Sequence, residues 1–498
     1  MSEAATRPSA DPGALLASLD PLLRGWLPRQ RWFAGKGRPV AGFDLVAATE
    51  LLPPGAEQGL LHLLVRVRQS LPGAAPAADH ELPADCYQLL LGIRTELPPR
   101  LAPALIGHVT GGPLTGRTVY EALHDPRLAA LLLERLRLPG RLGVLRFLRA
   151  PRDGSAPGSP AAGNAHGIDI PPGLAPRALG AEQSNSSLVY GDTFILKLFR
   201  RVVPGVNPDL ELPLALATQG CRRVPPPAAW MTADSANGTD EPLVLGVLQP
   251  YVAGATDGWE LALQVLAKGA DFSAEARALG RATAEVHAAL AAALPTVTLG
   301  RAQVELLARG MAERLDAAAQ AVPALRPYAP ALRTAYDALA DLAAEGDTGL
   351  MAQRVHGDLH LGQCLRAPSG TWSLIDFEGE PARPLAERRL PQPAARDVAG
   401  MLRSFDYAAR VYRPWSPEWA DTCRAAYCSG YADVSGRDPR TSPVLLRAHE
   451  TDKAVYEAVY EARHRPDWLP VPLAALDRLA AGSSTPEGAA DPGTDASL

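Results

Sequence analysis

The sequence predicts an α+β fold with two lobes, a β-rich lobe first and a mostly helical lobe second. Short apolar runs separated by turn residues fill the chain to about residue 252, as in Leu60–Val67 and Phe194–Phe199. From about residue 259 to 475, apolar residues recur mainly at helical spacing. A chain of 498 residues exceeds one ordinary domain, so we expect two or three units.

We expect four segments along the chain. Residues 1–115 would form a small N-terminal subdomain, and residues 116–252 a β-rich lobe with a flexible insertion near 151–167. Residues 253–480 would form the helical lobe, and residues 481–498 a disordered tail. The insertion and the tail are rich in Pro, Gly, Ala and Ser, and segments of this composition do not bury a core.

Composition excludes several classes of partner. The formal net charge of −5 gives no broad electrostatic reason to bind nucleic acid or an anionic membrane. The five cysteines contain no C-x-x-C pair, which disfavours a disulfide framework or a zinc cage and fits a reducing compartment. The chain shows no secretory segment and no apolar run that could span a bilayer. We therefore expect a cytoplasmic monomer.

A lysine interrupts an otherwise apolar strand of the β-rich lobe. Lys197 lies within Phe194–Phe199, where a charge must reach water, pair with an acid or face a polyanion such as a nucleotide phosphate. Glu211, at the start of the next expected helix, is the candidate ion-pair partner. An edge-strand lysine with its ammonium in water is the alternative.

Two further segments of this lobe fit a nucleotide site. The turn Ser184, Asn185, Ser186 and Ser187 precedes a strand, and its N–H and hydroxyl groups could surround phosphate oxygens. Without a Gly-rich or Walker pattern, an ordinary Ser/Asn turn is the alternative. Gly191-Asp192 predicts a hairpin after that strand. Gln249, Tyr251 and Val252 end a later strand, and the backbone of such a segment could hydrogen-bond the adenine of a nucleotide.

Two motifs within the helical part carry the chemistry. Arg354-Val-His-Gly-Asp-Leu-His-Leu-Gly-Gln-Cys364 places Asp358 in a tight loop and Gln363 five positions later, and Leu374-Ile-Asp-Phe-Glu378 supplies Asp376 after a short strand. The two histidines around Asp358 could instead complete a metal site, or only brace a loop. The paired motifs favour phosphoryl transfer, in which Asp358 accepts the proton of an attacking hydroxyl while Gln363 and Asp376 bind magnesium.

Two helical segments are expected around this loop. Asp397 is placed to cap a helix that would brace the catalytic loop from below. Farther on, Tyr456 and Tyr460 lie one turn apart, as do Glu457 and Glu461, and aromatic rings beside carboxylates suit a polyhydroxylated ligand. A core-facing Tyr stripe with a solvated Glu face is the alternative for most of them, with one or two, Glu457 and Tyr460 foremost, lining the site.

Outside the Pro- and Ala-rich segments, the chain resembles the actinobacterial maltokinases, relatives of the aminoglycoside phosphotransferases and other eukaryotic-like kinases. The His356–His360 motif is shared across that superfamily. Narrower marks are Gln363 in place of the more usual Asn, the extension Phe377–Pro381 and the N-terminal block Arg29–Trp32. Further matching blocks are Glu182–Ser187, Ile195–Arg201, Asp452–Glu457 and Arg463–Pro470.

The resemblance implies ATP-dependent, magnesium-dependent phosphorylation of maltose to maltose 1-phosphate, which feeds α-glucan (glycogen) synthesis from trehalose. It implies an N-terminal cap subdomain and association with trehalose synthase. By position it makes Asp358 the base, Gln363 and Asp376 magnesium ligands, and Lys197 with the Ser184–Ser187 turn a phosphate site. His360, Glu378 and Arg403 are weaker candidates near the sugar.

Three alternatives to maltose phosphorylation stay open. An amino sugar such as glucosamine could be the acceptor, because a related branch looks much the same. An aminoglycoside fits less well, since a polycation needs a denser acidic lining. A catalytically inactive sugar- or nucleotide-binding module is disfavoured by the intact set of Lys197, Asp358, Gln363 and Asp376.

Overall fold

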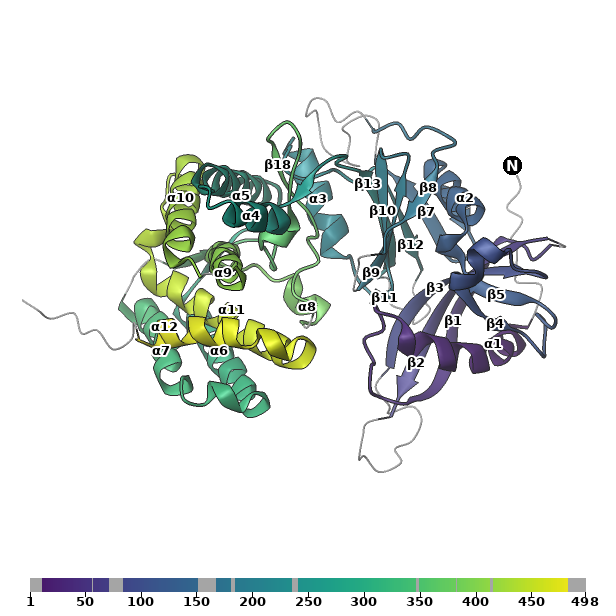
Figure 1. Ribbon diagram of the computed structural model, residues 1–498, viewed down its shortest axis with the longest axis horizontal. Helices are drawn as coiled ribbons and strands as arrows, with labels where there is room; N and C mark the ends of the chain where they lie inside the picture. The colour runs from purple at the N-terminus through teal and green to yellow at the C-terminus, as the bar shows by residue number, and fades with distance from the viewer. Residues whose placement is uncertain are drawn as a thin grey trace, which may run out of the picture. The chain divides into compact units, whose positions relative to one another are not determined.

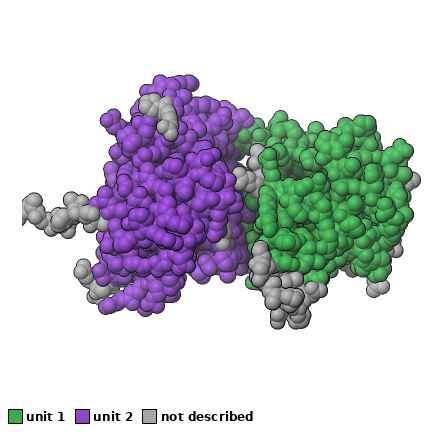
Figure 2. All heavy atoms as spheres, turned by 60° about the horizontal axis from the view of Figure 1, so that its bottom comes forward, with its two compact units in different colours: residues 1–220, 225–253 green, residues 221–224, 254–498 purple. Residues whose placement is uncertain are grey.

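The computed structural model describes residues 11–481, except 56, 71–83, 151–166, 181–183, 235–240, 346–348, 382 and 413–414. The chain forms two compact units, coloured separately in Figure 2. Unit 1 comprises residues 1–220 and 225–253, and unit 2 comprises residues 221–224 and 254–498. The expected insertion near 151–167 and the expected tail lie outside the described residues, apart from their end positions. Within the described part, no helix is long and apolar enough to cross a membrane.

The first sheet of unit 1 is antiparallel and follows an N-terminal helix (Figure 1). Its strand order is β1-β2-β3-β5-β4, and the short strand β11 pairs with β3. Helix α1 begins after Asp11, whose carboxylate accepts the N–H of Gly13 at 3.3 Å. The elements are α1 Pro12–Trp26, β1 Val40–Leu52, β2 Gly59–Gln69, β3 Ala84–Arg94, β4 Leu105–His108, β5 Thr118–Glu121 and β11 Arg201–Val202.

The second sheet of unit 1 has the order β6-β7-β12-β13-β10-β9-β8. The expected hairpin at Gly191-Asp192 is confirmed, because β9 and β10 are antiparallel neighbours joined by residues 191–193, and Gly191 and Asp192 have positive φ values of 55° and 49°. The strands are β6 Gly140–Leu142, β7 Leu145–Arg149, β8 Pro176–Ala178, β9 Asn185–Tyr190, β10 Phe194–Phe199, β12 Ala229–Ala233 and β13 Leu243–Pro250.

Two helices complete unit 1. Helix α2, Pro126–Arg137, starts at the cap Asp125, and α3, Pro208–Thr218, starts at the cap Asn207. Helix α2 follows a four-residue strand, β5, that periodicity did not reveal. The two sheets share a large apolar core, so the β-rich lobe predicted from sequence is confirmed.

Unit 2 is mostly helical (Figure 1). Its central helix α9 is buried along most of its length and packs against α10 and α11. Helices α5 and α10 approach closely, since a Cβ at Gly430 would lie 2.0 Å from the carbonyl of Arg277. The helices are α4 Gly258–Ala267, α5 Ser273–Ala293, α6 Arg301–Ala321, α7 Ala329–Glu345, α8 Leu385–Arg388, α9 Ala395–Val411, α10 Pro417–Ser435, α11 Pro443–His464 and α12 Pro470–Ala481.

Small sheets frame the loops of unit 2. One joins β14 Thr256–Asp257, β17 Cys364–Arg366 and β18 Trp372–Leu374, and the other joins β15 Val297–Leu299 and β16 Leu350–Ala352. The β17–β18 hairpin separates the two sequence motifs, so it fixes the position of Asp376 relative to Gln363. The α+β class, with antiparallel sheets first and helices second, is confirmed.

Candidate functional site

The strand lysine of unit 1 is paired with a helix carboxylate. Lys197 projects from β10, and its ammonium lies 2.9 Å from Asp209 in the first turn of α3. Asn207 accepts the backbone N–H of Asp209 at 2.9 Å and so starts the helix at this point. Sequence reasoning selected Glu211, in the same turn, and did not select Asp209; pairing with Glu211 stays a prediction.

The polar run Ser184–Ser187 belongs largely to a strand. We expected a turn, but β9 begins at Asn185, and only Ser184 of this run lies in a bend. Ser187 lies directly opposite Lys197 in the antiparallel pair β9–β10, so both side chains project from one face of the sheet. Ser186 accepts a hydrogen bond from Arg200 at 2.8 Å.

Residues 249–252, at the end of β13 and just after it, differ in whether their hydrogen-bonding groups already have partners. Gln249 donates its side-chain amide to the carbonyl of Pro225 at 2.9 Å. Tyr251 donates its N–H to Thr193 and accepts from Ala253, so both of its backbone groups are engaged. Among the described residues, the N–H of Val252 has no acceptor. Of the three residues predicted to contact adenine, Val252 is therefore the one with a free backbone donor.

The loop that contains the proposed base Asp358 is hydrogen-bonded to helix α9. Asp397 is almost fully buried, and its carboxylate accepts the backbone N–H groups of His356 at 2.7 Å and Gly357 at 2.8 Å. Its third partner is His287, at 2.9 Å. Burial would raise the pKa of Asp397, but the hydrogen bond from His287 and the other contacts keep it below its ordinary value. The bracing role expected of Asp397 agrees with these contacts, but the helix cap is Ala394, so the capping prediction is wrong.

The carboxylate of Asp358 is bound by an ammonium group from α11. Lys453 lies 2.7 Å from Asp358 and 3.2 Å from Glu380. Burial would lower the pKa of Lys453, but Asp358 and Glu380 raise it above its ordinary value, so this side chain stays charged. Glu380 is also bound by Arg383 at 2.7 Å and Arg396 at 2.8 Å. Burial would raise the pKa of Glu380, but Lys453 and these two arginines keep it below its ordinary value.

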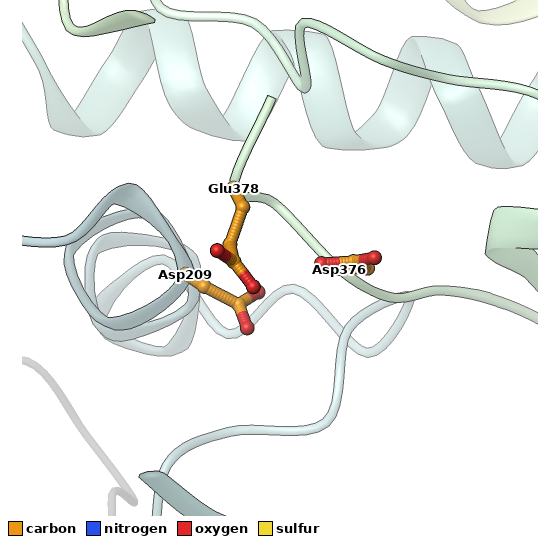
Figure 3. A group of neighbouring side chains, drawn as sticks. All are labelled: Asp209, Asp376 and Glu378. Atoms are coloured by element: carbon orange, nitrogen blue, oxygen red, sulfur yellow. The ribbon is translucent and has the colours of Figure 1, made fainter. Parts of the chain in front are cut away.

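The expected magnesium residues lie together in unit 2. Gln363 donates its side-chain amide to Asp376 at 3.0 Å, which leaves its carbonyl oxygen as the group able to face a metal. Carboxylate oxygens of Asp376 and Glu378 lie within 4.8 Å of each other, on the segment after β18 shown in Figure 3. Asp376 has a φ of 67°, an uncommon backbone state that often marks a functional residue. Oxygen ligands of this kind suit Mg²⁺, so the residues fit the ion.

The histidines of the loop do not form a zinc site. His356 uses one ring nitrogen on the carbonyl of Ile375 at 2.9 Å, and its ring packs against Phe377. His360 caps the short 3-10 helix after the loop by accepting the N–H of Gly362. Within the described residues, His356, Asp358 and His360 do not gather as a ligand cluster. Burial lowers the pKa of His360, so its imidazole is neutral near pH 7.

The remaining sugar candidates lie on α9, which carries Arg403, and on α11, which carries Glu457 and Tyr460. Arg403 is 1% exposed and binds Glu457 at 2.6 Å and Asp406 at 3.1 Å, so it acts as a buried brace in this structure. Tyr460 is half-buried and stacks on Tyr456 at 6.5 Å between ring centroids. The roles of His360, Glu378, Arg403, Glu457 and Tyr460 toward a sugar stay predictions.

Sequence reasoning did not assign roles to Lys453, Glu380 and His287. A usable signal existed for the first: Lys453, Tyr456 and Tyr460 recur at helical spacing, so one face of α11 carries a charge and two rings. Glu380 lies in the extension Phe377–Pro381, but its contact with Lys453 joins residues 73 positions apart, and His287 and Asp397 are 110 positions apart, so the sequence did not reveal these contacts.

Comparison with known proteins supports this assembly. Residues 26–125 match the family model "Maltokinase N-terminal cap domain", and residues 173–437 match "Phosphotransferase enzyme family". A glucosamine kinase of Streptacidiphilus jiangxiensis is 33% identical over 330 residues, covering 61% of this chain and 73% of the relative.

Two solved structures of glucosamine kinase are similar to this chain. One, in complex with glucosamine, ADP and inorganic phosphate, is 30% identical with a TM-score of 0.54, over 62% of this chain and 80% of that chain. Another, crystal form B, is 24% identical with a TM-score of 0.63, over 97% and 100% of the two chains, and bears on the fold.

A β-rich lobe with a strand lysine, together with a helical part that carries a His-Gly-Asp loop and a following Asp, defines a kinase-like phosphotransferase. The chain belongs to the phosphotransferase enzyme family, in the group that includes the glucosamine kinases. Its residues 26–125 form a maltokinase-type N-terminal cap domain. The resemblance drawn from the motifs is confirmed at this level. The boundaries predicted for the four segments stay predictions.

Proposed function

We propose that the protein transfers the γ-phosphoryl group of ATP to a sugar hydroxyl and that maltose is the acceptor. The observation that carries the proposal is the fixed carboxylate of Asp358, held by Lys453 at 2.7 Å on a loop whose N–H groups bind Asp397. In the same unit, Gln363 and Asp376 form the hydrogen-bonded companion pair that a transferase of this class needs.

In this mechanism Asp358 orients the acceptor hydroxyl and accepts its proton as the oxygen attacks phosphorus. Lys197, kept in place by Asp209, neutralises phosphate charge. The oxygens of Gln363, Asp376 and Glu378 would hold magnesium, which supplies charge neutralisation on the transferred phosphate. Because the transition state of phosphoryl transfer is loose, positioning by these residues contributes more than the strength of the base.

The charge around the base supports a neutral acceptor. The ion-pair network that contains Asp358 joins three carboxylates to four cations, so its formal charge is +1. A protonated amino sugar would add a further cation beside this network. The groups are Asp358, Glu380 and Asp452 with Lys453, Arg314, Arg383 and Arg396. The stacked rings of Tyr456 and Tyr460 on the adjoining face of α11 suit the C–H face of a sugar ring.

Glucosamine is the second candidate, favoured by the relatives that carry this name. The test is ADP release by the full chain with ATP and magnesium, using maltose, glucosamine, kanamycin and no acceptor. We expect rapid release with maltose and identification of maltose 1-phosphate by NMR. Faster turnover of glucosamine would replace maltose as the acceptor, and no release with any sugar would refute the kinase proposal.

The place of the reaction in metabolism is a further part of the proposal. A sugar 1-phosphate is an activated glycosyl donor, so maltose 1-phosphate suits α-glucan assembly from trehalose-derived maltose. Association with trehalose synthase would belong to the same proposal, and co-purification of the two full-length proteins tests it.

A further inference from the structure

An aromatic ring of the N-terminal loop covers a buried arginine. Trp32 follows α1 and is 9% exposed; its ring packs edge-on to Trp26 and lies 5.9 Å from the ring of Tyr87 on β3. The guanidinium of Arg200 lies 4.9 Å from the centroid of Trp32. This is a cation–π contact in a water-poor site, where such contacts are strongest.

The same arginine reaches the polar strand β9. Arg200 is 2% exposed, binds Glu121 of β5 at 3.0 Å and donates to the hydroxyl of Ser186 at 2.8 Å. Its Nη1 has no hydrogen-bond partner among the residues that the structure describes. Burying a charged guanidinium costs free energy unless it is paired and hydrogen-bonded, so the contacts with Glu121 and Ser186 define the position of Arg200.

The backbone around Arg200 belongs to both sheets of unit 1. Its carbonyl accepts the N–H of Gln88 on β3 at 2.9 Å, and the next two residues form β11, which pairs with β3. Gln88 in turn donates its side-chain amide to the carbonyls of Phe199 and Leu245. Arg200 therefore stands where the N-terminal sheet meets the sheet that carries Ser186, Ser187 and Lys197.

We propose that Arg200 is a positioning residue that couples the N-terminal cap to nucleotide binding. Trp32 and Glu121 fix the guanidinium, and the guanidinium fixes Ser186 in the strand proposed to contact the phosphates. The inference rests on the proposed nucleotide site of this lobe. Its consequence is that a change in the cap loop, with no nucleotide contact of its own, alters affinity for ADP and ATP.

The test compares two aromatic residues of the same cap core. Trp32→Leu removes the ring over Arg200, whereas Phe43→Leu removes a ring whose nearby cation is Arg24, 5.4 Å from its centroid. Binding of mant-ADP to the full chain is measured without a sugar, with KM for ATP and kcat alongside. We expect Trp32→Leu to raise Kd and KM for the nucleotide about tenfold while kcat changes less than twofold, and Phe43→Leu to leave all three unchanged.

A double-mutant cycle then tests the route through Arg200. In the background Arg200→Met/Glu121→Gln, which removes both buried charges together, Trp32→Leu should have no additional effect on Kd. Arg201→Met, a change of the exposed neighbour that pairs with Asp85, is the control. Should the double variant fail to fold in a thermal melt, Ser186→Ala replaces it, and Trp32→Leu should again be silent in that background.

Equal effects of Trp32→Leu and Phe43→Leu, or a Trp32→Leu effect that persists without Arg200 or Ser186, would overturn the coupling and leave the proposed function intact. A wild-type chain that binds no mant-ADP would overturn both. Binding of mant-ADP with the expected pattern, but no transfer to any sugar, would support the coupling and refute the kinase proposal alone.

Discussion

At the scale of single residues, the chemistry depends on a few side chains whose partners are now defined. Asp358, Gln363 and Asp376 could be proposed from sequence because they belong to motifs of fixed spacing, and their roles stay predictions. The contact between Lys453 and Asp358 was not predicted, because the two residues are 95 positions apart and the helical spacing around Lys453 does not name its partner. Asp209 was missed for another reason, since two acidic residues lie in the first turn of α3 and the sequence alone did not distinguish Asp209 from Glu211. Sequence reasoning therefore identified the proposed reacting groups but missed the residues that hold them.

The first residue-scale prediction concerns the proposed base. Asp358→Asn keeps the shape of the side chain but removes proton acceptance, so we expect kcat to fall about 10³-fold. The variant should retain its cooperative melt and its mant-ADP affinity, because Lys453 keeps Glu380 as a partner. Turnover within tenfold of the wild type would contradict the role of Asp358.

The second residue-scale prediction concerns the metal. Asp376→Ala removes a proposed oxygen ligand and the acceptor of the Gln363 amide, so the magnesium concentration needed for half-maximal activity should rise at least tenfold. Magnesium titration of ADP release measures it. Asp192→Ala, an exposed aspartate in the β9–β10 turn, is the control. A titration curve that coincides with the wild type would remove Asp376 from the site.

At the scale of elements, helix α9 fixes the backbone of the loop that contains Asp358, through the hydrogen bonds of Asp397. The sequence predicted a helix here and a bracing role for it, but placed the cap at Asp397, three residues after the observed N-cap, Ala394. Asp and Asn are favoured caps, so local propensity was misleading. Asp397 lies inside the helix because its carboxylate accepts hydrogen bonds from two N–H groups of the loop and contacts His287.

The element-scale prediction follows from those three hydrogen bonds. In Asp397→Asn one oxygen becomes an NH₂ group, which faces a donor instead of accepting from it. Loss of one such buried bond costs about 1–3 kcal/mol, and we expect kcat to fall roughly 10- to 100-fold with little change in KM for ATP. Steady-state kinetics check this, with Asp433→Asn on the exposed face of α10 as the control. An unchanged kcat would show that the loop needs no brace.

The same scale shows why some strands escaped prediction. The sequence located β2, β10 and β13, whose residues are mostly apolar. It missed β5, a strand of four residues, because so short a run carries little period-2 signal. The polar start of β9 was taken for a turn, since Ser and Asn favour turns unless a partner strand claims their backbone.

At the scale of the whole molecule, two buried histidines should make stability depend on pH. Burial lowers the pKa of His62 in unit 1 and of His449 in unit 2 to about 4 each. An unfolded imidazole titrates near 6.5, so below that pH the unfolded chain binds protons that the folded chain does not. The stabilisation is complete above pH 6.5 and is lost as the pH falls toward 4, at up to about 1.4 kcal/mol per pH unit for each histidine.

Thermal melts between pH 5 and 7.5 check this prediction. The melting temperature should fall with pH below 6.5, and the fall should be shallower in His62→Gln and in His449→Gln. His464→Gln, which changes an exposed histidine, is the matched control. Parallel curves for wild type and both buried variants would contradict the assignment.

The ammonium of Lys453 on Asp358 has a consequence for the resting protein. Water can also attack the γ-phosphate of ATP, and it would need a carboxylate to accept its proton, as a sugar hydroxyl does. With no sugar present, that carboxylate is already engaged at 2.7 Å by an internal cation. With Asp358 as the proposed base, this ion pair would disfavour the transfer of phosphate from ATP to water while no acceptor is bound.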